Sequence, residues 1–184
     1  MTTDPTPDEC LVNSFPALEG SRARVLVLGT MPGTHSLVAT QYYAHARNAF
    51  WPMALAVCAQ GTPAPDLAFI VPYEERVARI TDAGIAVWDV LASCERRGSL
   101  DSAIVNGSEV PNDIIAFAKR HPELERVVFN GKTSERLFLR HVMKAEESES
   151  TFENIELIGA PSTSPAMASL TLEEKFVAWS KVLS

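Results

Sequence analysis

The sequence predicts an α/β protein, built as a three-layer α/β/α sandwich with a central four-stranded, mostly parallel sheet. Four short apolar runs, rich in valine and isoleucine, are typical of strands that are buried on both faces. Stretches with helical patterning lie between and after these runs. Strands that alternate with helices favour a parallel sheet covered by helices on each face.

The predicted elements follow directly from these patterns. The apolar runs place strands at residues 23–29, 84–88, 126–129 and 155–158. Helices are expected over residues 46–59, 112–120, 133–143 and 172–183. Segment 146–156 carries five glutamates and no basic residue, which predicts a solvated surface excursion.

The length of 184 residues suits one domain with one sizeable core. Residues 1–14 open with a polar, acidic stretch that lacks hydrophobic periodicity, and they are expected to form a flexible arm. Residues 15–184 are expected to form the single α/β domain. The chain shows no signal-peptide pattern and no run of 18 apolar residues, so neither export nor a membrane span is expected.

The net charge of −7, taken alone, argues against a nucleic-acid partner. The charge is unevenly distributed, however: residues 21–60 contain three arginines, two histidines and no acidic residue. A locally basic face can therefore exist on an acidic protein. An ordinary fluctuation of charge along the chain remains the alternative.

The three cysteines, Cys10, Cys58 and Cys94, include no C-x-x-C pair. This disfavours both a disulfide framework and a zinc site, and it fits a reducing cytoplasm. The loop at 29–36 lacks the lysine of a P-loop and the G-x-G-x-x-G pattern of a dinucleotide site. Neither a metal nor a cofactor is expected.

Ligands of parallel sheets bind at the carboxyl ends of the strands. Four polar or glycine- and proline-rich segments follow the predicted strands, at 29–33, 89–91, 130–132 and 160–166. The first is a proline-containing turn whose backbone amides suit close approach of a ligand or a phosphate. An ordinary strand-to-loop turn is the alternative.

Segment 41–51 concentrates four aromatic side chains with His45, Arg47 and Asn48. Aromatic faces beside an arginine are surfaces on which flat heterocycles stack. Trp51 is better explained as a core residue. Asn48 is either the cap of the helix that follows or a group directed at a substrate.

These segments together resemble the uracil-DNA glycosylase superfamily, and most closely its hypoxanthine-DNA (deoxyinosine) glycosylase branch. The resemblance covers the chain from about residue 23 to its end. It is carried by VLGTMPGTHSL (27–37), QYYAHARNAFW (41–51), WDVLASC (88–94) with RGSLDS (97–102), and PSTSPA (161–166). Two departures are visible: Ala46 stands where that branch usually has proline, and Thr30 where it often has serine.

The resemblance implies a DNA glycosylase of base-excision repair that flips a deaminated base, with hypoxanthine as the expected substrate, and hydrolyses its N-glycosidic bond. The chain is long enough to stand alone as a monomer, which is the expected state. The aspartate and histidine of the uracil branch are replaced here by Met31 and Ser162. The catalytic residue implied is Asn48, whose amide does not titrate but can hold a water by hydrogen bonds. Asp89 is expected to select the deaminated base, with a turn cap as the alternative.

The resemblance and the strand-end rule together give the candidate site. The substrate-binding set is Gly29, Thr30, Met31, Pro32, Gly33, Ser36, Tyr42, Tyr43, His45, Phe50, Asp89 and Asn130. The DNA-binding set is Arg47, Ser162, Ser164, Pro165 and Ala166.

Among the five lysines, only Lys132 lies in a strand-end motif, so a Schiff-base lyase step is not expected and the enzyme should be monofunctional. Three alternatives stay open. The chain can be a uracil or mismatch glycosylase on the same fold, a non-catalytic DNA-binding relative, or a small-molecule hydrolase, because fold alone does not settle function.

Overall fold

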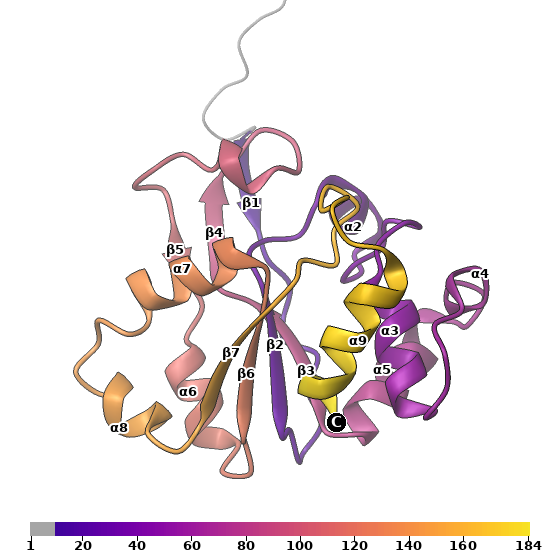
Figure 1. Ribbon diagram of the computed structural model, residues 1–184. Coiled ribbons are helices and arrows are strands. Elements are labelled where there is room, and N and C mark those ends of the chain that lie inside the picture. Colours follow the sequence, from indigo (N-terminus) through magenta and orange to yellow (C-terminus); the bar gives the residue numbers. More distant parts are fainter. Residues whose placement is uncertain (1–9) are drawn as a thin grey trace, which may run out of the picture.

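The computed structural model describes residues 10–184, and its central sheet has four parallel strands (Figure 1). Their order across the sheet is β3 (Ile85–Asp89), β2 (Val25–Gly29), β6 (Arg126–Asn130) and β7 (Glu156–Ala160). The predicted fold class is confirmed, and the bounds of each predicted strand are correct to within two residues.

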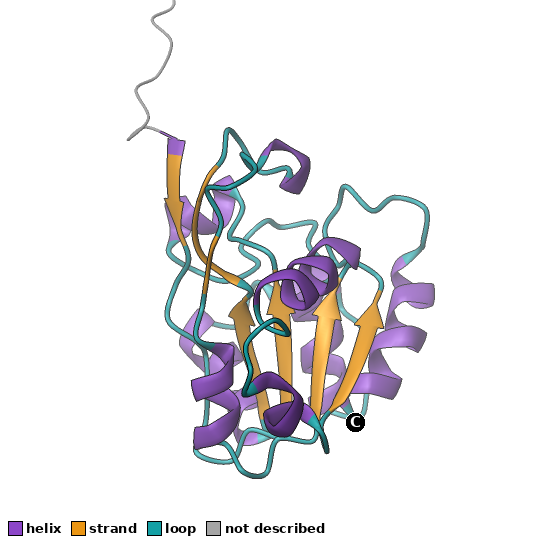
Figure 2. Ribbon diagram, turned by 90° about the vertical axis from the view of Figure 1, so that its left-hand side faces the viewer, coloured by secondary structure: helices purple, strands orange, loops and turns teal. Residues whose placement is uncertain are grey.

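Helices cover both faces of this sheet (Figures 1 and 2). One layer contains α3 (Phe50–Cys58), α5 (Tyr73–Asp82) and α9 (Leu172–Leu183), and the other α6 (Ile114–Arg120), α7 (Lys132–His141) and α8 (Ser148–Phe152). Alternate residues of a strand point to opposite faces. Leu26 and Leu28 of β2 therefore pack in the α6–α8 core, while Val25 and Val27 pack in the α3–α9 core.

A second, antiparallel sheet was not predicted from the sequence. It consists of β1 (Leu11–Asn13), β4 (Leu91–Glu95) and β5 (Val110–Pro111), with β4 in the middle. The flexible arm expected over residues 1–14 is therefore too long at its carboxyl end, because residues 11–13 form β1 and pair with β4. Residues 1–9 of that arm lie outside the described residues.

The helix expected over 46–59 begins only at Phe50, because the four preceding residues form turns. Helix α5 was not predicted, nor were the shorter α2 (Thr34–Ala39), α4 (Pro65–Ala68) and the 3₁₀ turn η1 (Asp101–Ala103). The glutamate-rich segment is only partly a surface excursion: it contains α8, whose Phe152 is buried with its ring 5.2 Å from that of Phe138.

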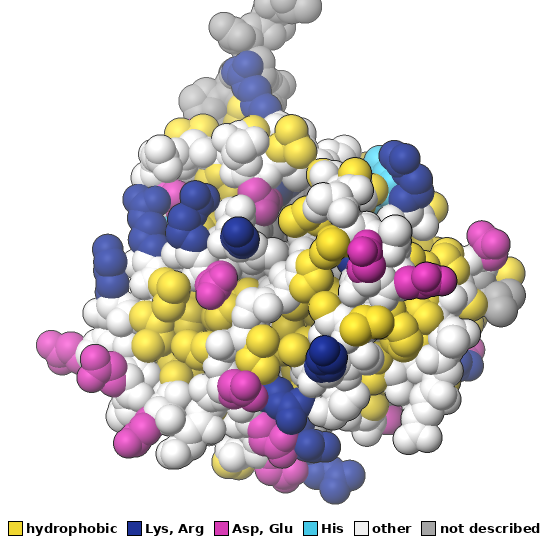
Figure 3. All heavy atoms as spheres, in the orientation of Figure 1, with side chains coloured by type: hydrophobic (Ala, Val, Ile, Leu, Met, Phe, Trp, Pro, Cys, Tyr) yellow, Lys and Arg dark blue, Asp and Glu magenta, His cyan; other side chains and the backbone are white. Residues whose placement is uncertain are grey.

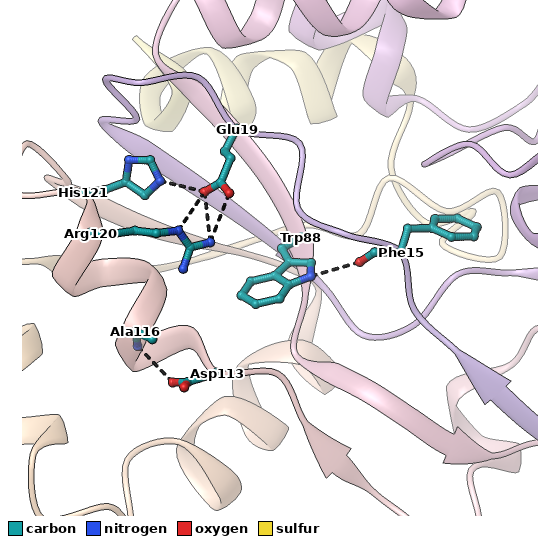
Figure 4. Close-up of polar contacts among 7 residues, drawn as sticks. All are labelled: Phe15, Glu19, Trp88, Asp113, Ala116, Arg120 and His121. Atoms are coloured by element: carbon teal, nitrogen blue, oxygen red, sulfur yellow. Dashed lines mark hydrogen bonds and ion pairs between the residues drawn. The ribbon is translucent and has the colours of Figure 1, made fainter.

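The segment before β2 is fastened along the edge of β3 (Figure 4). Trp88 Nε1 donates to the carbonyl of Phe15 at 3.0 Å, and Leu18 forms an isolated antiparallel bridge with Val87. The Glu19 carboxylate accepts from Arg120 at 3.0 Å and lies 2.7 Å from His121 Nε2, which joins this segment to α6. Among the described residues, no helix is both long and apolar enough to cross a membrane.

Candidate functional site

The topology places a crevice at the carboxyl ends of β2 and β6. From β2 the chain first adds β3 on one side and later β6 on the other, so the strand order reverses at β2. Such a switch point is where open parallel sheets bind ligands. A cavity of about 500 Å³ opens there, and it is lined by all four strand-end segments identified from the sequence.

Of the candidate residues, all except Arg47 and Phe50 line this cavity. Phe50 is fully buried behind it, with its ring centroid 4.3 Å from that of Tyr43. Phe50 therefore supports Tyr43 from behind and does not face the cavity, which corrects the expected substrate contact. Arg47 is exposed. The cavity also has lining residues that were not chosen as candidates: Thr34, His35, Ser99, Leu100, Asp101, Thr163 and Met167.

Asp89 ends β3 and lies buried against β2. Ser14 Oγ donates to its Oδ2 at 2.7 Å, and Asn112 Nδ2 donates to its backbone carbonyl at 2.9 Å. Burial, which disfavours the charged form, raises the pKa of Asp89 to about 7; the Ser14 hydrogen bond acts in the opposite direction. This side chain can therefore change its protonation state near neutral pH.

Asp101 holds the first loop in place. Thr30 Oγ1 donates to Asp101 Oδ2 at 2.8 Å, and the buried guanidinium of Arg96 lies 3.9 Å from Oδ1 and donates to the carbonyl of Pro32. Burial raises the pKa of Asp101. In the same region, Ser99 Oγ accepts from the backbone N–H of Thr34 at 2.8 Å. The loop after β2 is thus fastened to the segment after β4.

Tyr43 has a left-handed backbone, with φ of 54°, which is uncommon for a bulky residue and costs about 1–3 kcal/mol. Its neighbour Tyr42 is fixed on three sides. Trp51 Nε1 donates to the Tyr42 carbonyl at 2.8 Å, Tyr73 Oη accepts from the Tyr42 N–H at 3.0 Å, and Tyr42 Oη donates to the Phe15 carbonyl at 3.1 Å. These contacts maintain the strained turn that brings Tyr43 to the cavity wall.

Asn48 lies two residues before α3 and at the cavity wall. Its Oδ1 accepts from the N–H of Phe50, the first residue of α3, at 3.0 Å, whereas the N-cap position itself is taken by Ala49 and not by Asn48. Within the described part of the chain its Nδ2 group forms no hydrogen bond, and Asn48 lines the cavity. The N–H of Ala49 donates to the carbonyl of Thr163 at 3.0 Å, which joins this turn to the last strand-end loop.

That last loop, residues 161–167, is held from two sides. Asn130 Nδ2 donates to Thr163 Oγ1 at 2.9 Å, and Asn130 Oδ1 accepts from the Thr163 N–H at 2.8 Å. The Asn130 amide therefore positions the loop, and Asn130 also lines the cavity. From α9, Lys175 Nζ donates to the Met167 carbonyl at 2.8 Å, and Trp179 Nε1 to the Pro161 carbonyl at 2.9 Å.

Two imidazoles, those of His35 and His45, stand edge to face at the cavity with ring centroids 4.4 Å apart. The N–H of Arg47 donates to His45 Nδ1 at 3.0 Å, so this nitrogen is an acceptor. Burial, then the neighbouring His35 and Arg47, lower the pKa of His45. Neutral His45 thus carries its proton on Nε2, where it is a donor.

Comparison with known proteins identifies similar sequences. The sequence model of the Uracil DNA glycosylase superfamily matches residues 16–183. A Hypoxanthine DNA glycosylase of Methanosarcina acetivorans is 34% identical over 118 residues, which are 64% of this chain and 70% of that protein. A Hypoxanthine DNA glycosylase of Methanosarcina barkeri is 32% identical over 120 residues, which are 65% and 71% of the two chains.

The fold is similar to a solved structure as well. The solution NMR structure of a candidate uracil DNA glycosylase from Methanosarcina acetivorans superimposes with a TM-score of 0.73. The two sequences are 24% identical, and the match covers 94% of this chain and 96% of the other. At that identity the likeness concerns the fold alone.

Proposed function

This chain belongs to the uracil DNA glycosylase superfamily and is a DNA glycosylase, and from this premise we propose that it excises hypoxanthine from DNA in base-excision repair. The observation that supports the proposal most directly is that Asn48 and the buried Asp89 line the same cavity. One side chain can hold a water, and the other can recognise a base.

Recognition of the base depends on Asp89. A carboxylate only accepts hydrogen bonds, and hypoxanthine presents an N1–H donor where adenine presents an acceptor. Ionised Asp89 therefore favours hypoxanthine over the adenine from which it arises. The ring of Tyr43, supported by Phe50, offers a surface on which the flipped base can stack.

In the proposed reaction, the N-glycosidic bond of the flipped nucleotide is hydrolysed by a water that Asn48 holds. Cleavage breaks the bond between C1′ and N9, and the electron pair leaves with the base. Water held by the Asn48 amide adds to C1′ of the oxocarbenium-like sugar, and the proton it releases balances the proton gained by the departing base. No lysine is found among the cavity-lining residues, which supports a monofunctional enzyme without a Schiff base.

We further propose that the protein acts as a monomer in the cytoplasm. Cys10, Cys58 and Cys94 are free thiols, which suits a reducing compartment. Uracil is the second candidate substrate, because its N3–H can donate to Asp89 in the same way.

The test is alkali-revealed strand cleavage of labelled duplexes that carry a single hypoxanthine or a single uracil, opposite each base in turn. EDTA inhibits contaminating metal-dependent nucleases. Low salt favours binding of the protein to the duplex. Cleavage at hypoxanthine, lost in Asn48→Ala, is the expected result. Cleavage at uracil alone would show that uracil, and not hypoxanthine, is the substrate.

Absence of cleavage at both bases by folded protein overturns the proposed activity. Binding to the same duplexes would then indicate a non-catalytic DNA-binding protein.

A further inference from the structure

Basic side chains are concentrated over α7. Figure 3 shows a group of Lys and Arg side chains on the upper left of the molecule, where α7 lies in Figure 1. Along the lower edge, by contrast, basic and acidic side chains alternate. An acidic protein that binds DNA needs such a local concentration of positive charge.

The row on α7 has a regular spacing. Lys132 and Arg136 are exposed and four residues apart, so they lie one above the other on the same face of the helix. Arg140 continues the row one turn later, but its guanidinium lies 3.4 Å from Glu109 Oε1. The one acidic residue of α7, Glu135, is turned toward β7, where a β-carbon on Gly159 would lie 3.2 Å from its Oε2.

This row starts at the rim of the cavity. Helix α7 follows Gly131, where a β-carbon would lie 3.1 Å from Ser162 Cβ in the last strand-end loop. The charge of Arg136 also favours the ionised form of Asp101, which lines the cavity. The two basic residues therefore lie beside the place where a flipped nucleotide would enter.

We propose that Lys132 and Arg136 bind two phosphates of the DNA strand that flanks the nucleotide in the cavity. The inference rests on the proposed function, and it names a surface outside the cavity. Four residues of α-helix span about 6 Å, which lets the two side chains reach neighbouring phosphates spaced about 3.4 Å apart along the duplex axis. Because contacts to phosphates do not depend on the base sequence, this surface binds the duplex without contributing to base specificity.

The test is the salt dependence of binding to a fluorescent duplex without a damaged base, which cannot be cleaved during the measurement. The double variant Lys132→Gln/Arg136→Gln is compared with Arg22→Gln/Lys181→Gln, which removes the same charge at two exposed residues away from α7. Arg22 precedes β2, at the amino end of that strand and away from the cavity at the carboxyl ends, and Lys181 lies in the last turn of α9.

We expect the slope of log K against log salt to become shallower by about 1.8 in the α7 variant, since each lost phosphate contact contributes about 0.9. The control variant should keep the wild-type slope. Equal slopes in the two double variants, with thermal unfolding unchanged, would overturn the proposal.

A second measurement separates this proposal from the proposed function. In single-turnover excision of hypoxanthine, the α7 variant should need at least tenfold more enzyme for half-maximal rate, while the rate at saturation stays within threefold of wild type. A wild type that excises no base, together with a slope that falls only in the α7 variant, contradicts the proposed activity and supports the phosphate surface. A wild type that excises hypoxanthine, with an unchanged slope in the α7 variant, contradicts the phosphate surface alone.

Discussion

Gly29 and Asp89 are register partners at the ends of β2 and β3, and the Asp89 carboxylate fills the space that a side chain at position 29 would need. A β-carbon there would overlap with Asp89 Oδ1 and would lie 3.2 Å from Tyr43 Oη. The absence of a side chain at Gly29 therefore leaves room at the cavity wall for both the Asp89 carboxyl group and the Tyr43 hydroxyl.

Gly29→Ala should consequently damage both stability and activity. The methyl group must displace either Asp89 or Tyr43, and overpacking of this kind costs about 1–3 kcal/mol. We expect a lower denaturation midpoint in urea together with a loss of hypoxanthine excision. Gly61→Ala is the control, since a β-carbon there meets nothing within 4 Å; equal behaviour of the two variants would contradict the close approach.

Asp89 should make the stability of the protein depend on pH. Its native pKa of about 7 lies above the value of about 3.9 in an unfolded chain. The stability that this group contributes is therefore complete below about pH 4 and is lost as pH rises toward 7. Asn in its place cannot ionise, so Asp89→Asn should gain stability relative to wild type between pH 4 and pH 8, as measured by thermal unfolding.

The same substitution should alter the choice of base. An amide can turn to present either a donor or an acceptor, so Asp89→Asn no longer discriminates against the N1 acceptor of adenine. Discrimination between hypoxanthine and adenine should fall by about 10- to 100-fold, the size expected for one base-edge interaction of about 1–3 kcal/mol. Single-turnover rates on duplexes with each base measure it, and an unchanged ratio would rule out a selective role.

Asn48→Ala should lower the excision rate by about 10²- to 10³-fold, as expected when one preorganised hydrogen-bonding group is removed. It should also lower stability by about 1 kcal/mol, because the N–H of Phe50 loses its hydrogen-bond acceptor. Asn48→Ser separates the two effects, since a hydroxyl can still accept this hydrogen bond but supplies no amide group. Recovery of full excision by the serine variant would show that this hydrogen bond alone explains the residue.

Lys175→Met should loosen the last strand-end loop. The variant keeps the apolar stem but leaves the carbonyl of Met167 without its donor, at a cost of about 1–2 kcal/mol, while the carbonyl of Ser164 keeps the N–H of Met167. We expect a lower midpoint of thermal unfolding and slower excision. Lys181→Met, on an exposed turn of the same helix, should change neither, and similar losses in both variants would place the effect in α9 rather than in the loop.

Much of the fold could be predicted because its signals are local. Strands such as β2, buried on both faces, have continuous apolar runs, and the loops after them mark the crevice of a parallel sheet. Helix α5 had a readable signal as well, since Glu74 and Glu75 open it and Val77 and Ile80 follow at helical spacing. The antiparallel pair of β1 and β4 had none, because each strand is short and its partner is about 80 residues away in the chain.

The candidate site was predictable to the same extent. Asp89 stands in a strand-end segment and Asn48 in the aromatic segment 41–51, whereas Asp101 reaches Thr30 from η1, 71 residues later. Lys175 has the sequence context of an ordinary surface lysine, and only the docking of α9 directs it at two loop carbonyls. Contacts of this kind depend on tertiary packing and leave no pattern in the neighbouring sequence.

Residues from opposite ends of the described chain support the cavity. Ser14 is hydrogen-bonded to Asp89, and α9 holds the loop at 161–167. During synthesis α9 is made after every other element described here, and domains fold as units as the chain emerges. A nascent chain that still lacks α9 contains the sequence of every strand of the central sheet but lacks Lys175 and Trp179, which hold the loop. The loop that lines the cavity is therefore held in place only after α9 has been made and has docked.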